Sequence, residues 1–187
     1  MSAYLEMIKP AEDIKVRSFI DYGHVFVHPH WHKEVEIIYV KKGTVNIGVN
    51  DKPITLHEGD IYIINGGDVH YFFASPNSER IILIFDPILF QELAEAKEKS
   101  LKSQIAKIYP SSHNWDDELV NKVQKLLYVI LTEIDSKQVG YQYAIKARMF
   151  ELVTLFFREM PLKDSKDLVE SKIKYSEQKE ILEKLDL

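Results

Sequence analysis

The stretch His30-Trp31-His32-Lys33-Glu34-Val35-Glu36 decides the expected fold and places polar chemistry inside it. In an extended strand, successive side chains point to opposite faces, so residues of the same parity share one face. His30, His32 and Glu36 have the same parity. We therefore expect two imidazoles and a carboxylate to project together into the interior of a β structure.

The residues that follow extend this stretch into a longer spaced pattern. It reads His30-x-His32-x3-Glu36-x6-Gly43, followed by Gly59 and by Gly67-x2-His70. The spacing resembles the two motifs of the cupin barrel, with Asn65 in place of the usual proline, Ala74 in place of the closing asparagine, and Gly23 one residue early. The resemblance implies a jelly-roll barrel in which His70 joins the other three polar side chains.

Two longer stretches carry a narrower resemblance. Residues 29–40 (PHWHKEVEIIYV) and 58–65 (EGDIYIIN) are similar to the N-terminal, effector-binding domain of AraC-type bacterial transcription regulators. The resemblance implies a non-enzymatic sensing and dimerisation domain for a small molecule, a carbohydrate or related metabolite. In sugar-responsive members the N-terminal arm folds over the effector. A helix-turn-helix domain follows in that family, so DNA is expected to be bound only through a domain missing from residues 1–187.

Composition bounds the class of protein. The 187 residues suit one domain with an appendage, and 45% hydrophobic with 28% charged residues predict a folded globule. The net charge of −5 disfavours DNA binding by this chain alone. There is no cysteine, which excludes disulfide and thiolate chemistry. Neither a signal peptide nor an apolar run of the roughly 20 residues that span a bilayer is recognisable, so we expect a cytoplasmic protein without a membrane partner.

Short alternating segments make the first half of the chain mainly β. Residues 14–22, 34–40, 43–49, 61–64, 69–73 and 79–85 have strand composition and are bounded by turn residues. The expected fold is mainly β with an α appendage: a cupin-type β-barrel (jelly roll) followed by two long α-helices. We expect residues 1–86 to form the effector-binding barrel with its N-terminal arm, residues 87–161 a helical dimerisation region, and residues 162–187 a linker helix towards the missing domain.

The two long helices are predicted from apolar residues at helical spacing. One pattern runs through residues 111–136, with Asn114 as its expected cap, and the other from Tyr141 to Met160, before Pro161. The second helix carries two apolar stripes, and one barrel face cannot cover both. We therefore expect a homodimer, although packing within one monomer is the alternative. The candidate contact residues are Leu126, Ile130, Ile145, Met149, Leu152 and Phe156.

The candidate ligand-binding and metal-binding residues are His30, His32, Glu36 and His70. Imidazoles and a carboxylate suit a divalent transition metal such as Zn, Ni, Fe or Mn. Ile38 and Phe72 share the inward parity and are expected to narrow the ligand cavity. The alternative is a metal-free, hydrogen-bonded polar floor.

A second hypothesis for function uses the same four residues. A metal-dependent cupin enzyme, such as a dioxygenase or a sugar isomerase, would bind its metal through His30, His32, Glu36 and His70. The long helices count against it, because a small cupin enzyme has less need of them. No P-loop, GxSxG, HExxH or dinucleotide motif is present.

Overall fold

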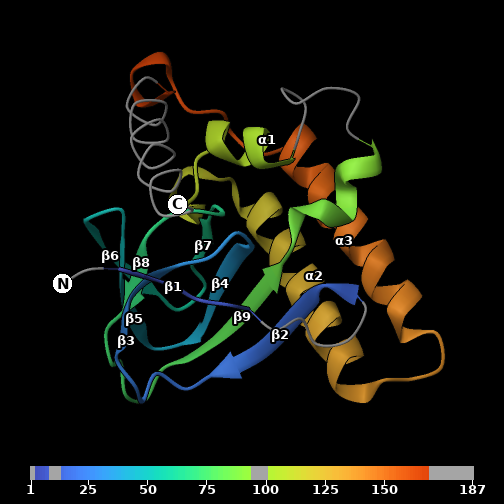
Figure 1. Ribbon diagram of the computed structural model, residues 1–187, viewed down its shortest axis with the longest axis horizontal. Helices are drawn as coiled ribbons and strands as arrows, with labels where there is room; N and C mark the ends of the chain where they lie inside the picture. Colours follow the sequence, from blue (N-terminus) through green and yellow to red (C-terminus); the bar gives the residue numbers. More distant parts are fainter. Residues whose placement is uncertain (1–2, 9–13, 94–100, 169–187) are drawn as a thin grey trace.

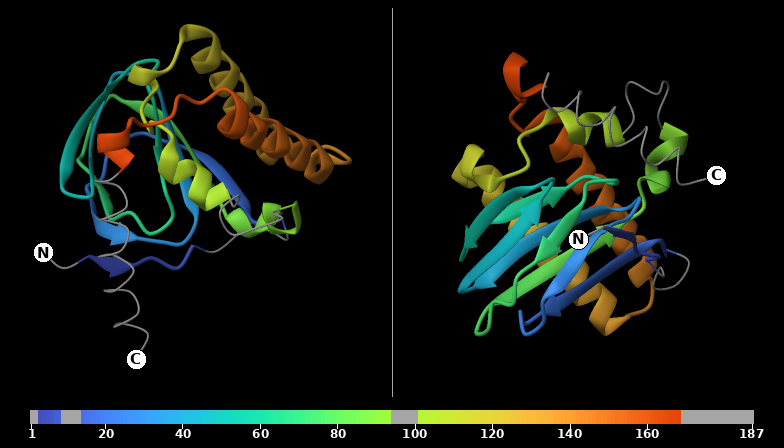
Figure 2. Two further views of the ribbon diagram at one scale, coloured as in Figure 1. Left: turned by 90° about the horizontal axis from the view of Figure 1, so that it is seen from above. Right: turned by 60° about the vertical axis from the view of Figure 1, so that its left-hand side comes forward.

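The computed structural model describes residues 3–8, 14–93 and 101–168, and two β-sheets with helices against one of them make up its architecture (Figure 1). One sheet has five strands in the order β1 (Tyr4–Leu5), β3 (Val27–Trp31), β8 (His70–Phe72), β5 (Thr44–Val49) and β6 (Lys52–His57). The other has four, in the order β2 (Val16–Asp21), β9 (Glu79–Phe85), β4 (Val35–Lys42) and β7 (Ile61–Ile64). Figure 2 shows the long helices on one side of the sheets and the N-terminal strand on the opposite side.

The central strands β4 and β9 are buried on both faces. Ile38 and Ile82 point into the core between the two sheets, whereas Ile37 and Leu83 point into the core beneath the helices. Successive side chains still point to opposite faces, but the side chains on both faces are apolar because each face packs against another layer. This explains why these strands read as nearly continuous hydrophobic runs.

The helical layer begins with 3₁₀ helix η2 (Pro87–Leu93) and α1 (Leu101–Lys107), and continues through η4 (Ser112–Asn114) to α2 (Asp117–Ser136) and α3 (Tyr141–Arg158). The cap of α2 is Asp116, whose side chain accepts a hydrogen bond from the Leu119 N–H at 2.8 Å. The expectation of Asn114 as the cap is wrong, because that residue ends η4. None of the helices in the described ranges has the length and apolar character to cross a bilayer.

The sequence prediction of the fold is correct in class and wrong in two details. The protein is mainly β with two long helices, but its described strands form two sheets rather than one closed barrel. The alternation of apolar and polar residues shows which face of a strand is buried. The same alternation is expected in a closed barrel, where the sheet edges pair, and in two separate sheets, where they do not. The described residues also contain a third α-helix, α1, whose seven residues are too few to show a stripe.

The residues predicted to contact a second subunit lie inside the helical core of this chain. Leu126, Ile130, Ile145, Met149, Leu152 and Phe156 are all buried within the chain itself. The homodimer itself stays a prediction, but a second copy would meet other side chains. Of the predicted linker, residues 169–187 lie outside the described part of the chain.

Candidate metal and effector site

The four polar residues predicted from parity and spacing come together between the sheets. His30 on β3 lies directly opposite His70 on β8, while Glu36 projects from β4 of the other sheet. His32 follows β3 in the connection to β4. Each is no more than 3% exposed. The two sheets therefore enclose three imidazoles and one carboxylate in a largely apolar interior.

The side chains of this histidine cluster (His30, His32, His70 and Glu36) are close enough to share one ion. One ring nitrogen of each histidine lies within 4.8 Å of the other two. Glu36 Oε2 is 3.2 Å from His32 Nε2 and 3.6 Å from His70 Nε2. The Nε2 atom of His70 is buried and has no hydrogen-bond partner among the described residues.

Backbone carbonyls indicate which ring nitrogen of each histidine carries its proton. The Nδ1 atoms of His30, His32 and His70 lie 2.8, 3.2 and 2.9 Å from the carbonyl oxygens of His28, Glu34 and Asp68, respectively. A carbonyl oxygen can only accept, so each Nδ1 is assigned the hydrogen. The Nε2 of each neutral ring then holds a lone pair that faces the cluster. This is the arrangement with which histidines ligate metals.

The lone pairs and the Glu36 carboxylate require a cation between them. Burial by itself raises the pKa of Glu36, but the adjacent imidazoles of His32 and His70 outweigh burial and hold the pKa below its usual range. Burial lowers the pKa of His70, yet Glu36 and Asp68 together raise it by more, so the net direction is upward. Burial and the neighbouring His70 lower the pKa of His30. The cation is a proton on an imidazole or a metal ion, and the N and O ligand set fits Zn, Ni, Fe or Mn.

The N-terminal arm, residues 3–8, covers this cluster. Strand β1 pairs in parallel with β3, which sets Tyr4 beside His30 with ring centroids 5.7 Å apart. Glu6 Oε2 lies 3.1 Å from His30 Nε2. Sequence reasoning missed both arm residues, because the arm has no periodic pattern of its own.

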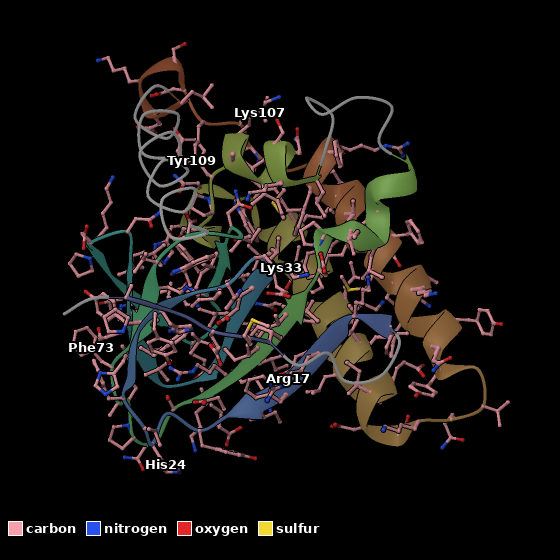
Figure 3. All side chains as sticks on the ribbon, in the orientation of Figure 1. Arg17, His24, Lys33, Phe73, Lys107 and Tyr109 are labelled. Atoms are coloured by element: carbon pink, nitrogen blue, oxygen red, sulfur yellow. The ribbon has the colours of Figure 1, made fainter. Side chains whose placement is uncertain are left out.

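A pocket of about 450 Å³ opens beneath the arm. Its apolar wall includes Leu5, Met7, Ile8, Trp31 and Ile84, and its charged lining includes Lys15, Arg17, Lys33, Glu6, Glu34 and Asp86. Two of these lining residues, Arg17 and Lys33, are labelled in Figure 3. The Glu6 and Glu34 carboxylates also lie 3.1 and 3.8 Å from His30 and His32 nitrogens, respectively, so the pocket adjoins the histidine cluster.

The two residues predicted to line the cavity also lie in the inter-sheet core. Ile38 and Phe72 are buried there, and the Phe72 ring centroid is 6.0 Å from that of His70. Their contact with an effector stays a prediction. Sequence reasoning missed Arg80, which shares their interior although it stands in the apolar strand β9. Its parity with Ile82 and Ile84 was the signal that could have found it.

Residues 14–153 match the family described as AraC-like ligand binding domain. The chain belongs to this family. Its membership confirms the AraC-type resemblance that residues 29–40 and 58–65 carry.

An individual relative and several solved structures match over shorter stretches. An uncharacterised HTH-type transcriptional regulator, YdeC of Bacillus subtilis (strain 168), is 36% identical over 45 residues, which are 24% of this chain and 16% of YdeC. The chain thus matches well under two thirds of that relative. A structure of the Mn(II) enzyme oxalate decarboxylase from Bacillus subtilis is 27% identical, covering 33% of this chain and 18% of that one, with a TM-score of 0.30. SPY1581 from Streptococcus pyogenes, of unknown function, is 14% identical over 38% of this chain and 63% of its own, with a TM-score of 0.35.

Proposed function

We propose that this AraC-like domain is the effector-sensing part of a bacterial transcription regulator and that it is not an enzyme. The observation that carries the proposal is the pocket of about 450 Å³ whose wall is formed by the N-terminal arm. Its volume and its mostly apolar surface, together with charged groups that can orient a ligand, are typical of small-molecule sites. A hydroxylated metabolite such as a carbohydrate is the proposed effector. Because its target is bacterial DNA, we place the protein in the cytoplasm.

The arm is the proposed element that responds to the effector. Glu6 lines the pocket and reaches His30, so a bound molecule either adds contacts to the arm or displaces Glu6. A ligand shifts the population of two arm positions only if it binds them with different affinity. DNA would be read through a helix of a domain outside this chain. The net charge of −5 supports a separate DNA-binding unit.

We also propose that the histidine cluster binds a divalent transition metal. His30, His32 and His70 would hold the ion with their Nε2 atoms, and Glu36 would supply the negative charge. Such an ion would act as a Lewis acid toward an effector oxygen. The unpartnered Nε2 of His70 supports this proposal, because buried polar atoms are normally satisfied.

A homodimer through the outer face of the long helices is the proposed assembly of residues 87–161. The side chains of Tyr128, Tyr143, Phe150 and Phe157 are exposed on α2 and α3. Aromatic residues are enriched in protein interfaces. These four replace the buried residues Leu126, Ile130, Ile145, Met149, Leu152 and Phe156 as candidate contacts.

Thermal-shift screening of sugars and related metabolites tests the sensing proposal. We expect at least one compound to raise the melting temperature saturably while remaining chemically unchanged, as judged by mass spectrometry. Consumption of many equivalents of the compound per chain would instead support the metal-dependent cupin enzyme. Stabilisation that is insensitive to removal of arm residues 1–8 would contradict a site beneath the arm.

Calorimetric titration with Zn²⁺ and Mn²⁺ tests the metal proposal, using protein purified without a nickel column. Wild type and the control His113→Ala should bind one ion per chain, because His113 is exposed and its ring contacts Asp60, remote from the cluster. His70→Ala should bind more weakly by over ~100-fold, beyond the loss usual for outer-shell changes. Equal affinity in wild type and His70→Ala would contradict the proposed site.

A further inference from the structure

Arg80 is a charged side chain held in the core between the two sheets. It is 1% exposed, and its neighbours on the adjacent strands are Asp21 and Val40. Its guanidinium carbon lies 4.6 Å from the centre of the Phe72 ring. Arginine is almost never fully buried unless its donors are paired.

The pairing of Arg80 is incomplete. Nη2 donates to Asp21 Oδ1 at 2.9 Å, but Nε and Nη1 are buried without a hydrogen-bond partner among the described residues. Asp21 Oδ1 also accepts from the Gly23 N–H at 2.7 Å. Each unsatisfied buried donor costs about 1–3 kcal/mol. Burial accordingly lowers the pKa of Arg80 despite the nearby Asp21 and Glu36 carboxylates.

We propose that Arg80 anchors the carboxylate of an organic-acid effector through its free N–H donors. This inference rests on the proposed sensing function and narrows its ligand class from hydroxylated metabolites to hydroxylated acids. A carboxylate accepts stronger hydrogen bonds from guanidinium than a neutral oxygen does. Asp21 supplies only part of the compensating charge, because its side chain is 34% exposed and shared with Gly23. Glu36 is engaged by His32 and His70.

Side chains on the inner face of β2 run from the pocket beneath the arm to Asp21, the partner of Arg80. Arg80 does not itself line that pocket, so an acid bound to it requires the pocket to extend inward along β2. Arg17, Phe19 and Asp21 share one parity on β2, and Arg17 lines the pocket. The Arg17 guanidinium lies over Phe19, which packs against the inter-sheet core, and Asp21 binds Arg80. The Phe72 ring, which contacts Arg80, also lies beside the His70 ring, with 6.0 Å between the two ring centroids. One small acid could therefore place its carboxylate on Arg80 and a hydroxyl group towards the histidine cluster.

Matched acids and amides test this anchor. Lactate, malate and D-glucuronate are titrated by calorimetry into the full chain, each beside its amide. We expect at least one acid to bind wild type at least about tenfold more tightly than its amide, which corresponds to about 1.4 kcal/mol. Arg80→Met should abolish this preference. The control Arg148→Met should retain it, because Arg148 is an exposed residue of α3.

The binding comparison requires that the Arg80 variant folds. Met fills the apolar site without buried donors, so Arg80→Met should fold with a melting temperature equal to or above that of wild type. If Arg80→Met does not fold, Arg80→Lys replaces it, since lysine keeps the charge but has no fork of donors. Equal binding of acid and amide, binding of neutral compounds alone, or an acid preference that survives in the variant would overturn the anchor. None of these outcomes would contradict the sensing proposal. Chemical conversion of a bound acid would contradict the sensing proposal but not the role of Arg80 in binding the carboxylate.

Discussion

Glu36→Gln should destabilise the metal-free protein in a way that depends on pH. The substitution keeps the shape of the side chain but removes the charge that His32 and His70 face at 3.2 and 3.6 Å. Hydrogen bonds to charged groups contribute about 1.5–3 kcal/mol each. His70 can shed its proton in the variant, which limits the loss. We therefore expect the free energy of unfolding to fall by about 2 kcal/mol at pH 6.

The pH window follows from the directions of the two pKa shifts. The folded-state pKa of Glu36 is lowered, so its contribution is present above the unfolded value near ~4.3 and is lost as pH falls through the folded pKa. The folded-state pKa of His70 is raised, so its contribution is present below ~6.5 and is lost as pH rises through the folded pKa. The difference between wild type and variant should be largest between these two values and smaller at pH 8.

Urea denaturation of chelator-treated protein at pH 6 and pH 8 measures this difference. The control Glu151→Gln removes an exposed carboxylate on α3 that pairs with Arg148, so it should change stability by less than about 1 kcal/mol. If Glu36→Gln were as stable as wild type at pH 6, or equally destabilised at both pH values, the charged pairing inferred for the histidine cluster would be refuted.

Three further substitutions test separate parts of the structure. Gly48→Ala should lower stability by about 1–3 kcal/mol in thermal or urea unfolding, because the new Cβ would collide with the Tyr71 ring that lies over Gly48; unchanged stability would contradict this packing. Glu6→Ala should speed hydrogen exchange of the arm by removing its contact with His30, and exchange at the wild-type rate would show that this contact does not hold the arm. Phe157→Ser should shift a dimer to monomer in light scattering without altering the fold, because Phe157 is exposed; an unaffected dimer would exclude this face as the contact.

Local periodicity was enough to predict the long helices and to single out three of the four residues of the histidine cluster. Alternation pointed to His30, His32 and Glu36, and the spacing resemblance added His70. The expectation of one extended strand through residues 30–36 is wrong, because His30 lies on β3, His32 in the connection that follows and Glu36 on β4 of the other sheet. The stripes of α2 and α3 depend on contacts three and four residues apart. These features are local, so a single sequence contains the signal for them.

Features that depend on distant partners could not be predicted in the same way. Separate sheets and a closed barrel bury the same alternating faces, so alternation did not distinguish them. Glu6 reaches His30 only because β1 pairs with β3, and the composition of the arm does not predict that pairing. Arg80 was not singled out from the sequence, although its parity with Ile82 directs it inward.

A crystal structure of the full chain with a stabilising metabolite is the most direct test of the central claim. The compound should lie between the arm, residues 3–8, and the inner face of β2, within reach of the histidine cluster. Density for the compound on the outer face of the helices or of the five-stranded sheet, with the space beneath the arm unchanged, would contradict the claim.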